Sequence, residues 1–164
     1  MAQEETFGTR DRSYSAWHRR LSMQRFVGIE KAQTLAMIDL DASLYVEYDD
    51  ASKEPIALIE AAMDRGQNYK SATVTMKLAA RCQPILPAYC VLYTIGNSPN
   101  PADKRWADIS EFRVRQIWPE PPPEWRVWRA MSPERYAIFL SRLRERSATF
   151  IAEMLHQQRA PTAA

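Results

Sequence analysis

Two neighbouring segments of the chain alternate apolar and polar residues with a period of two. The first covers residues 35–48 and the second residues 55–62, and a polar turn, residues 49–54, joins them. Alternation of this kind is typical of β-strands, whose successive side chains point to opposite faces. We therefore expect a β-hairpin in the middle of the fold, with Pro55 opening its second strand.

Acidic side chains occupy positions in this hairpin where a strand would usually carry apolar residues. Asp39 and Asp41 are two residues apart and would share one face of the first strand, and Glu60 lies near the end of the second. The hairpin would bring all three together. Clustered carboxylates repel one another unless a cation binds or a pKa rises. Asp39, Asp41 and Glu60 are therefore candidate metal ligands; the alternative is a hairpin end with exposed carboxylates.

Periodicity, capping residues and chain breakers predict the remaining elements. Ser132, Pro133 and Glu134 provide an N-cap, a first-turn proline and a first-turn acid, so a long helix should start there. Residues 26–33 fit either a short helix or a loop. The other predictions are a helix at 13–23, a helix at 69–82, a buried strand at 87–95, a loop at 96–106, a strand at 109–118 and an extended proline connector at 119–123.

These elements predict an α/β (α+β) fold with a mixed central sheet of about four strands, flanked by helices. We expect one domain at residues 13–158, between tails at 1–12 and 159–164. Within it, a core at 13–117 would precede an arm rich in proline and tryptophan at 118–130 and the long C-terminal helix at 132–157. The aromatic and arginine side chains of the arm could stack on unpaired bases or anchor a protein partner.

Composition excludes several classes of protein. Hydrophobic residues make up 46% of the 164 residues, and no apolar run is long enough to span a membrane. The first residues lack the apolar region of a secretory signal. Two cysteines and two histidines cannot form a zinc motif of the usual kind, and so few cysteines fit a reducing, cytoplasmic environment.

Charge is distributed unevenly although the net charge is only +2. Residues 39–64 carry eight acidic residues against one lysine, which gives −7, whereas residues 10–31 and 104–146 each carry +4. An acidic centre between basic flanks suits a metal site on a surface that attracts a polyanion. Segregation of solvated charge is the alternative.

The segments Ile38-Asp39-Leu40-Asp41 and Leu58-Ile59-Glu60-Ala61-Ala62 resemble the motif of the PD-(D/E)XK nuclease superfamily. The predicted helix at 69–82 and strand at 87–95 follow in the order of that family. The resemblance implies a restriction-endonuclease-like core in which Asp39 or Asp41, together with Glu60, binds Mg²⁺ or Mn²⁺. Hard oxygen ligands suit these ions.

One position departs from the family pattern. The lysine of the motif belongs two residues after Glu60, where this chain has Ala62. Some members of the family supply the lysine from the neighbouring helix. Lys70 and Lys77 would lie with Thr73 on one face of the predicted helix and are candidate replacements; the alternative is a solvated helix face.

Two functions remain open at this point. One is metal-dependent hydrolysis of phosphodiester bonds in DNA, with Asp39, Asp41, Glu60, Lys70 and Lys77 as site residues. The other is a catalytically inactive nuclease fold that binds nucleic acid or assembles with a protein. A homodimer or protein partner would use residues 118–157, and no membrane association is expected.

Overall fold

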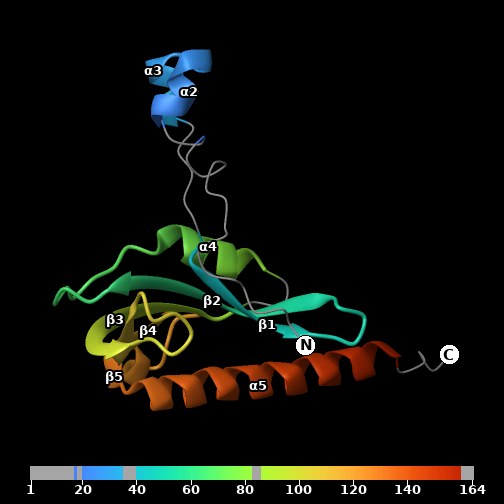
Figure 1. Ribbon diagram of the computed structural model, residues 1–164. Coiled ribbons are helices and arrows are strands. Elements are labelled where there is room, and N and C mark those ends of the chain that lie inside the picture. Colours follow the sequence, from blue (N-terminus) through green and yellow to red (C-terminus); the bar gives the residue numbers. More distant parts are fainter. Residues whose placement is uncertain (1–16, 18–19, 35–39, 83–85, 160–164) are drawn as a thin grey trace. The chain divides into compact units, whose positions relative to one another are not determined.

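The computed structural model describes residues 17, 20–34, 40–82 and 86–159, shown in colour in Figure 1. The chain separates into two compact units, Met1–Asp39 and Leu40–Ala164. The predicted tail at 1–12 lies outside the described residues, as do residues 160–164. Along the described part of the chain, no helix has the length and apolar character needed to cross a membrane.

The first unit contains two short helices, α2 (Arg20–Val27) and α3 (Ile29–Thr34). They meet at Gly28, whose positive φ of 79° favours glycine. The predicted helix at 13–23 therefore extends further along the chain, and its expected start lies outside the described residues. Of the two alternatives for residues 26–33, the helix is the one observed.

The second unit is built on a five-stranded mixed sheet with the order β1-β2-β3-β4-β5. Only β2 and β3 are parallel, and helix α4 connects them. The mixed α/β class is confirmed, with one strand more than expected. The elements are β1 (Ala42–Glu47), β2 (Lys53–Met63), α4 (Thr73–Arg81), β3 (Ala88–Pro99), β4 (Ala107–Trp118), a 3-10 turn (Pro123–Trp125), β5 (Arg129–Met131) and α5 (Pro133–Arg159).

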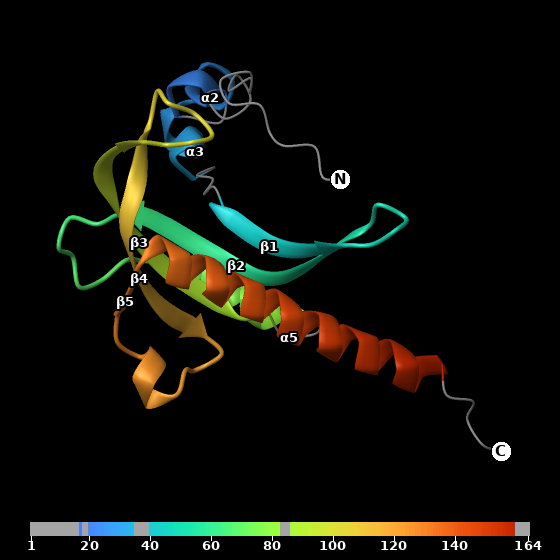
Figure 2. The same ribbon diagram turned by 60° about the horizontal axis from the view of Figure 1, so that its bottom comes forward.

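Helix α5 covers one face of the sheet (Figures 1 and 2). It begins as predicted: the Arg135 backbone N–H donates to Ser132 Oγ over 3.3 Å. Its apolar residues pack on alternate residues of the strands, as side chains on one face of a sheet must. Trp125 of the arm joins this core and makes an edge contact with Tyr89. The arm is therefore packed over the sheet.

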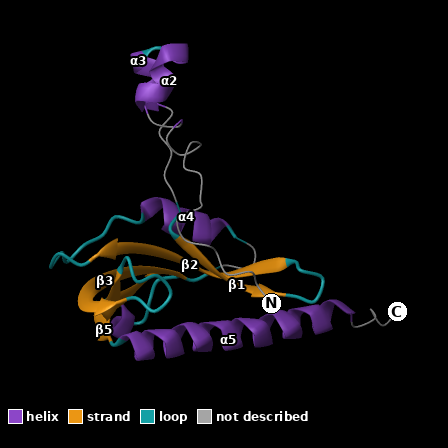
Figure 3. Ribbon diagram, in the orientation of Figure 1, coloured by secondary structure: helices purple, strands orange, loops and turns teal. Residues whose placement is uncertain are grey.

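Helix α4 covers the opposite face, so that the unit has three layers (Figure 3). Its buried side chains, Thr75 and Ala79, are four residues apart and lie on one side of the helix. Ala79 packs with Leu58 of β2 and Ala88 of β3. Glu60, Cys90 and Arg115 lie on this face, because they are in register with Leu58 and Ala88.

Several predicted boundaries are wrong. The expected strand at 35–48 includes Leu40 and Asp41, but β1 begins at Ala42, and residues 35–39 lie outside the described residues. The loop expected at 96–106 begins later, because β3 continues to Pro99. The added residues of β3 pair with β4, and the register between the two strands shifts after Thr94. Strand β5 was not predicted.

Candidate active site on the α4 face of the sheet

Glu60 is a buried acid on the inner face of β2. It lies two residues after Leu58, so both side chains point toward α4. Only 7% of Glu60 is exposed. Its Oε1 accepts a hydrogen bond of 2.8 Å from Lys70 Nζ, and its Oε2 accepts one of 2.9 Å from Thr75 Oγ1. A buried carboxylate needs such partners, and here both oxygens have one.

Lys70 reaches Glu60 from a loop rather than from a helix. The helix predicted at 69–82 begins only at Thr73, with Ala72 at its N-cap position. The expected helical face of Lys70, Thr73 and Lys77 is therefore wrong. Lys70 approaches Glu60, whereas Thr73 and Lys77 are exposed. Of the two candidate lysines, only Lys70 contacts Glu60.

Asp41 lies directly before β1, at the open end of the hairpin. β1 begins at Ala42, which pairs with Ile59 of β2. Asp41 is not part of the strand; its Oδ2 instead accepts a 2.7 Å hydrogen bond from the Ala61 backbone N–H. The third predicted acid, Asp39, lies outside the described residues.

The site can be compared with the needs of a divalent cation. Within residues 40–82 and 86–159, no three His, Cys, Asp or Glu side chains gather as metal ligands would. Magnesium, however, is commonly held by one or two carboxylates, with water and substrate phosphate completing its shell. Asp41 and Glu60 match that requirement in number and chemistry. Their oxygens each retain lone pairs beyond the bonds described above.

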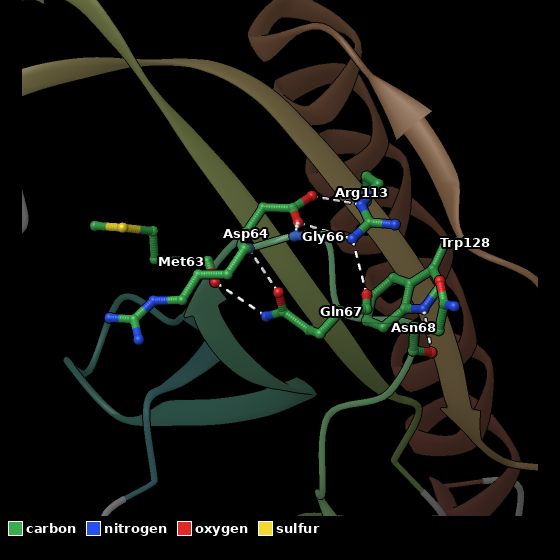
Figure 4. Close-up of polar contacts among 8 residues, drawn as sticks. Met63, Asp64, Gly66, Gln67, Asn68, Arg113 and Trp128 are labelled. Carbon is green, nitrogen blue, oxygen red and sulfur yellow. Dashed lines mark hydrogen bonds and ion pairs between the residues drawn. The ribbon is translucent and has the colours of Figure 1, made fainter.

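The loop before Lys70 is held in place by β4 and by the arm (Figure 4). Arg113 donates from Nε and Nη2 to the Asp64 carboxylate, and its Nη2 also donates to the Gln67 carbonyl over 2.9 Å. Trp128 Nε1 donates to the Asn68 carbonyl over 2.9 Å. The loop that carries Lys70 is thus fixed by residues that lie far away in the sequence.

Gly66 allows the tight turn inside this loop. Its φ of 78° is one that L side chains rarely adopt. Its N–H donates to Asp64 Oδ1 over 2.8 Å, so the carboxylate that binds Arg113 also closes the turn. Both bonds stabilise the charged carboxylate and lower the pKa of Asp64, with Arg113 making the larger contribution.

Cys90 and Arg115 continue the row of side chains that starts at Glu60. Glu60 pairs with Cys90 across β2 and β3, and Cys90 pairs with Arg115 across β3 and β4. Burial raises the pKa of the Cys90 thiol to about 11. The thiol is therefore neutral near pH 7 and is a poor nucleophile.

Sequence reasoning missed Thr75, Arg113 and Arg115. Thr75 could have been found, because Thr75 and Ala79 are small residues spaced by one helical turn, which suits a face packed on a sheet. The arginines give no such signal. Their importance depends on strand register, which a single sequence does not contain.

Comparison of the chain with protein-family models, with curated protein sequences and with solved structures finds no match. Function must therefore be argued from the site itself. Of the predicted site residues, Glu60 bonds Lys70, and Asp41 bonds the backbone N–H of Ala61, the residue that follows Glu60.

Proposed function

We propose that residues 40–164 form a metal-dependent nuclease domain of the PD-(D/E)XK class, which hydrolyses phosphodiester bonds in DNA. The observation that carries the proposal is the 2.8 Å contact between Lys70 Nζ and Glu60 Oε1. It puts an ammonium group beside Glu60 although the motif position, Ala62, has only a methyl group. The chain thus has the two acids and the lysine that the class requires.

Each side chain has a role in this proposal. Asp41 and Glu60 would hold Mg²⁺ or Mn²⁺, which when bound activates water and stabilises charge on the phosphate. Lys70, next to Glu60, would orient the attacking water and stabilise the negative charge that develops on the phosphate. Thr75 fixes the second oxygen of Glu60 and so sets the direction of its carboxylate.

The distribution of arginine supports a nucleic-acid substrate. On the α5 face, Arg129, Arg135, Arg142 and Arg146 line a pocket of about 430 Å³. None of the four forms an ion pair within the described residues, and Arg129 stacks over Trp125 at 4.4 Å. Arginines that lack acidic partners provide the positive surface that binds phosphate backbones.

The test compares two lysine variants in a cleavage assay. Purified protein is incubated with linear, circular and single-stranded DNA, with Mg²⁺, Mn²⁺ or EDTA. We expect metal-dependent cleavage that Lys70→Met lowers by at least about a hundredfold, the usual minimum for a group acting directly on the reaction. Lys77→Met removes the same charge from the exposed face of α4 and should leave cleavage unchanged. Undiminished cleavage by Glu60→Gln would falsify the assignment.

A second candidate function is a nuclease fold without activity that binds nucleic acid or a protein partner. The observation in its favour is that both oxygens of Glu60 already have protein partners. A carboxylate satisfied in this way can be purely structural. Titration calorimetry with Mn²⁺ distinguishes the two. Heat of binding that disappears in Asp41→Asn supports the enzyme, and a flat titration supports the binding protein. In the second case, sedimentation would test whether the protein dimerises through residues 118–157.

A further inference from the structure

A pocket of about 380 Å³ opens beside the candidate active site. It lies between the start of α4, the inner face of β4 and the arm. The residues that decide its chemistry are Tyr69, Lys70, Met76, Cys90, Arg115 and Trp128. Lys70 belongs both to this pocket and to the ion pair with Glu60, so it connects the pocket with that acid.

Arg115 is the unusual member of this lining. Its Nε is buried without a hydrogen-bond partner, and its guanidinium makes no ion pair with any described residue. Arg113, two residues earlier on the same face, is fully engaged by Asp64 and Gln67. A partly buried cation that lacks a partner lowers stability. A positive charge kept at such a cost implies a negatively charged ligand.

The other charges of the pocket are already neutralised. Lys70 is paired with Glu60, and Arg126 with Glu120 over 3.0 Å. Cys90 is a neutral thiol and does not repel an anion, since burial raises its pKa to about 11. Arg115 is thus left as the one uncompensated charge among the described lining residues. Its planar guanidinium can donate two parallel hydrogen bonds to a phosphate.

The rest of the lining suits a flat, apolar group. Tyr69 is 68% exposed, so its ring is accessible from solvent. Trp128 is held in position by its bond to Asn68 and by Arg113, whose guanidinium lies 5.5 Å from the centre of the ring. Aromatic side chains of this kind stack on nucleobases.

We propose that this pocket binds one nucleotide of a single DNA strand, with its phosphate on Arg115 and its base against Tyr69 and Trp128. That the ligand is a DNA strand rests on the proposed nuclease function. That the ligand is an anion rests on Arg115 alone. Because Lys70 adjoins both the pocket and Glu60, a strand anchored on Arg115 would pass close to Glu60. Arg115 would be a binding residue that presents the strand for cleavage.

The experiment measures binding in the absence of metal. A fluorescein-labelled deoxythymidine octamer is titrated by anisotropy, and thymidine 5′-monophosphate by calorimetry, both in EDTA. We expect Arg115→Met to weaken both by at least about tenfold, since a hydrogen bond to a charged group is lost. Arg115→Lys should be intermediate, because it keeps the charge but loses the guanidinium fork.

Arg81→Met is the matched control. Arg81 is an exposed arginine in the last turn of α4 and does not line the pocket. Its replacement should leave binding of the monophosphate unchanged. Melting curves check folding: Arg115→Met without ligand should be at least as stable as the wild type, and the monophosphate should raise the melting temperature of the wild type and of Arg81→Met but not that of Arg115→Met.

The results separate this inference from the proposed function. Wild-type binding of either probe that is unchanged by Arg115→Met and Arg115→Lys overturns the pocket, whatever the cleavage assay gives. The proposed pocket is overturned as well if the wild type binds neither probe. Arg115-dependent binding without any metal-dependent cleavage upholds the pocket and refutes the nuclease.

Discussion

Arg113 and Arg115 lie two residues apart on β4 and point to the same face of the sheet, but only Arg113 has an acidic partner among the described residues. The two therefore contribute to the molecule in opposite ways. Arg113 holds the loop at residues 64–68 through Asp64 and Gln67. Arg115 faces a pocket and has a buried nitrogen without a partner.

This contrast predicts opposite effects of the same substitution. Arg113→Met should lower the urea concentration at the unfolding midpoint, because the Asp64 carboxylate and the Gln67 carbonyl lose their donor. Arg115→Met should leave the midpoint unchanged or raise it, because a charge without a partner is replaced by an apolar side chain. Urea unfolding followed by tryptophan fluorescence measures both. Equal losses of stability would show that Arg115 has a structural partner.

Acid should weaken the contact between Asp64 and Arg113. The hydrogen bonds from Arg113 and Gly66 hold the pKa of Asp64 below its ordinary value of 3.8. A carboxylate whose pKa is lowered in the folded state stabilises the protein above its unfolded pKa, and this contribution is lost as pH falls through the folded pKa. The difference in unfolding midpoint between the wild type and Asp64→Asn should therefore shrink below about pH 4. A constant difference down to pH 2, roughly, would contradict this assignment.

Glu60 and Lys70 should be strongly coupled in stability. Lys70→Met leaves a buried carboxylate without its cation, which costs about 3 kcal/mol. Glu60→Leu together with Lys70→Met removes both charges and should cost clearly less than the two single changes added together. A double-mutant cycle by urea unfolding measures the coupling. Additive losses would mean that the ion pair contributes nothing to the fold.

Trp128 should order the loop that carries Lys70. Trp128→Phe keeps an aromatic ring, although a smaller one, and loses the hydrogen bond to the Asn68 carbonyl, at a cost of about 1 kcal/mol. Amide hydrogen exchange of residues 64–70 should become faster. Trp106→Phe is the control, because Trp106 is 65% exposed and should leave exchange in the loop unchanged. Faster exchange in both variants would argue against a specific role of Trp128.

The two thiols should differ in reactivity. Burial raises the pKa of Cys90 to about 11, so about one thiol in a thousand is ionised at pH 8 or so. Cys90 is also only 1% exposed, whereas Cys82 is partly exposed. Brief treatment with iodoacetamide should label Cys82 in the folded protein and both cysteines in urea. Peptide mass spectrometry identifies the sites, and rapid labelling of folded Cys90 would contradict the observed burial.

Local sequence patterns predicted the elements whose residues repeat with a clear period. The hairpin, the strand around Val114 and the helix that starts at Pro133 have such patterns, and the strand around Val91 was predicted from a continuous apolar run instead. Strand β5 could not be found this way, because it has three residues and exists by pairing with Phe112 to Val114. The start of α4 was placed too early because residues 69–72 have helical composition, while their conformation depends on the loop held by Arg113.

The candidate site was predictable only in part for a related reason. The position of Glu60 follows from alternation along one strand. The position of Arg115 depends on two registers, Glu60 with Cys90 and Cys90 with Arg115, between segments that are distant in the sequence. Thr75 is an intermediate case. Its helix is predicted from local sequence, but which side of the helix packs on β2 depends on distant residues.

The bond between Trp128 and Asn68 also has a consequence for synthesis of the protein. A ribosome makes Asp41, Glu60 and Lys70 long before it reaches Trp128. A growing chain that ends before this tryptophan contains both acids and the lysine but lacks one of the two side chains that fix the lysine loop. We therefore expect prematurely terminated products to contain the site residues without a formed site, so that the candidate site forms only late in translation.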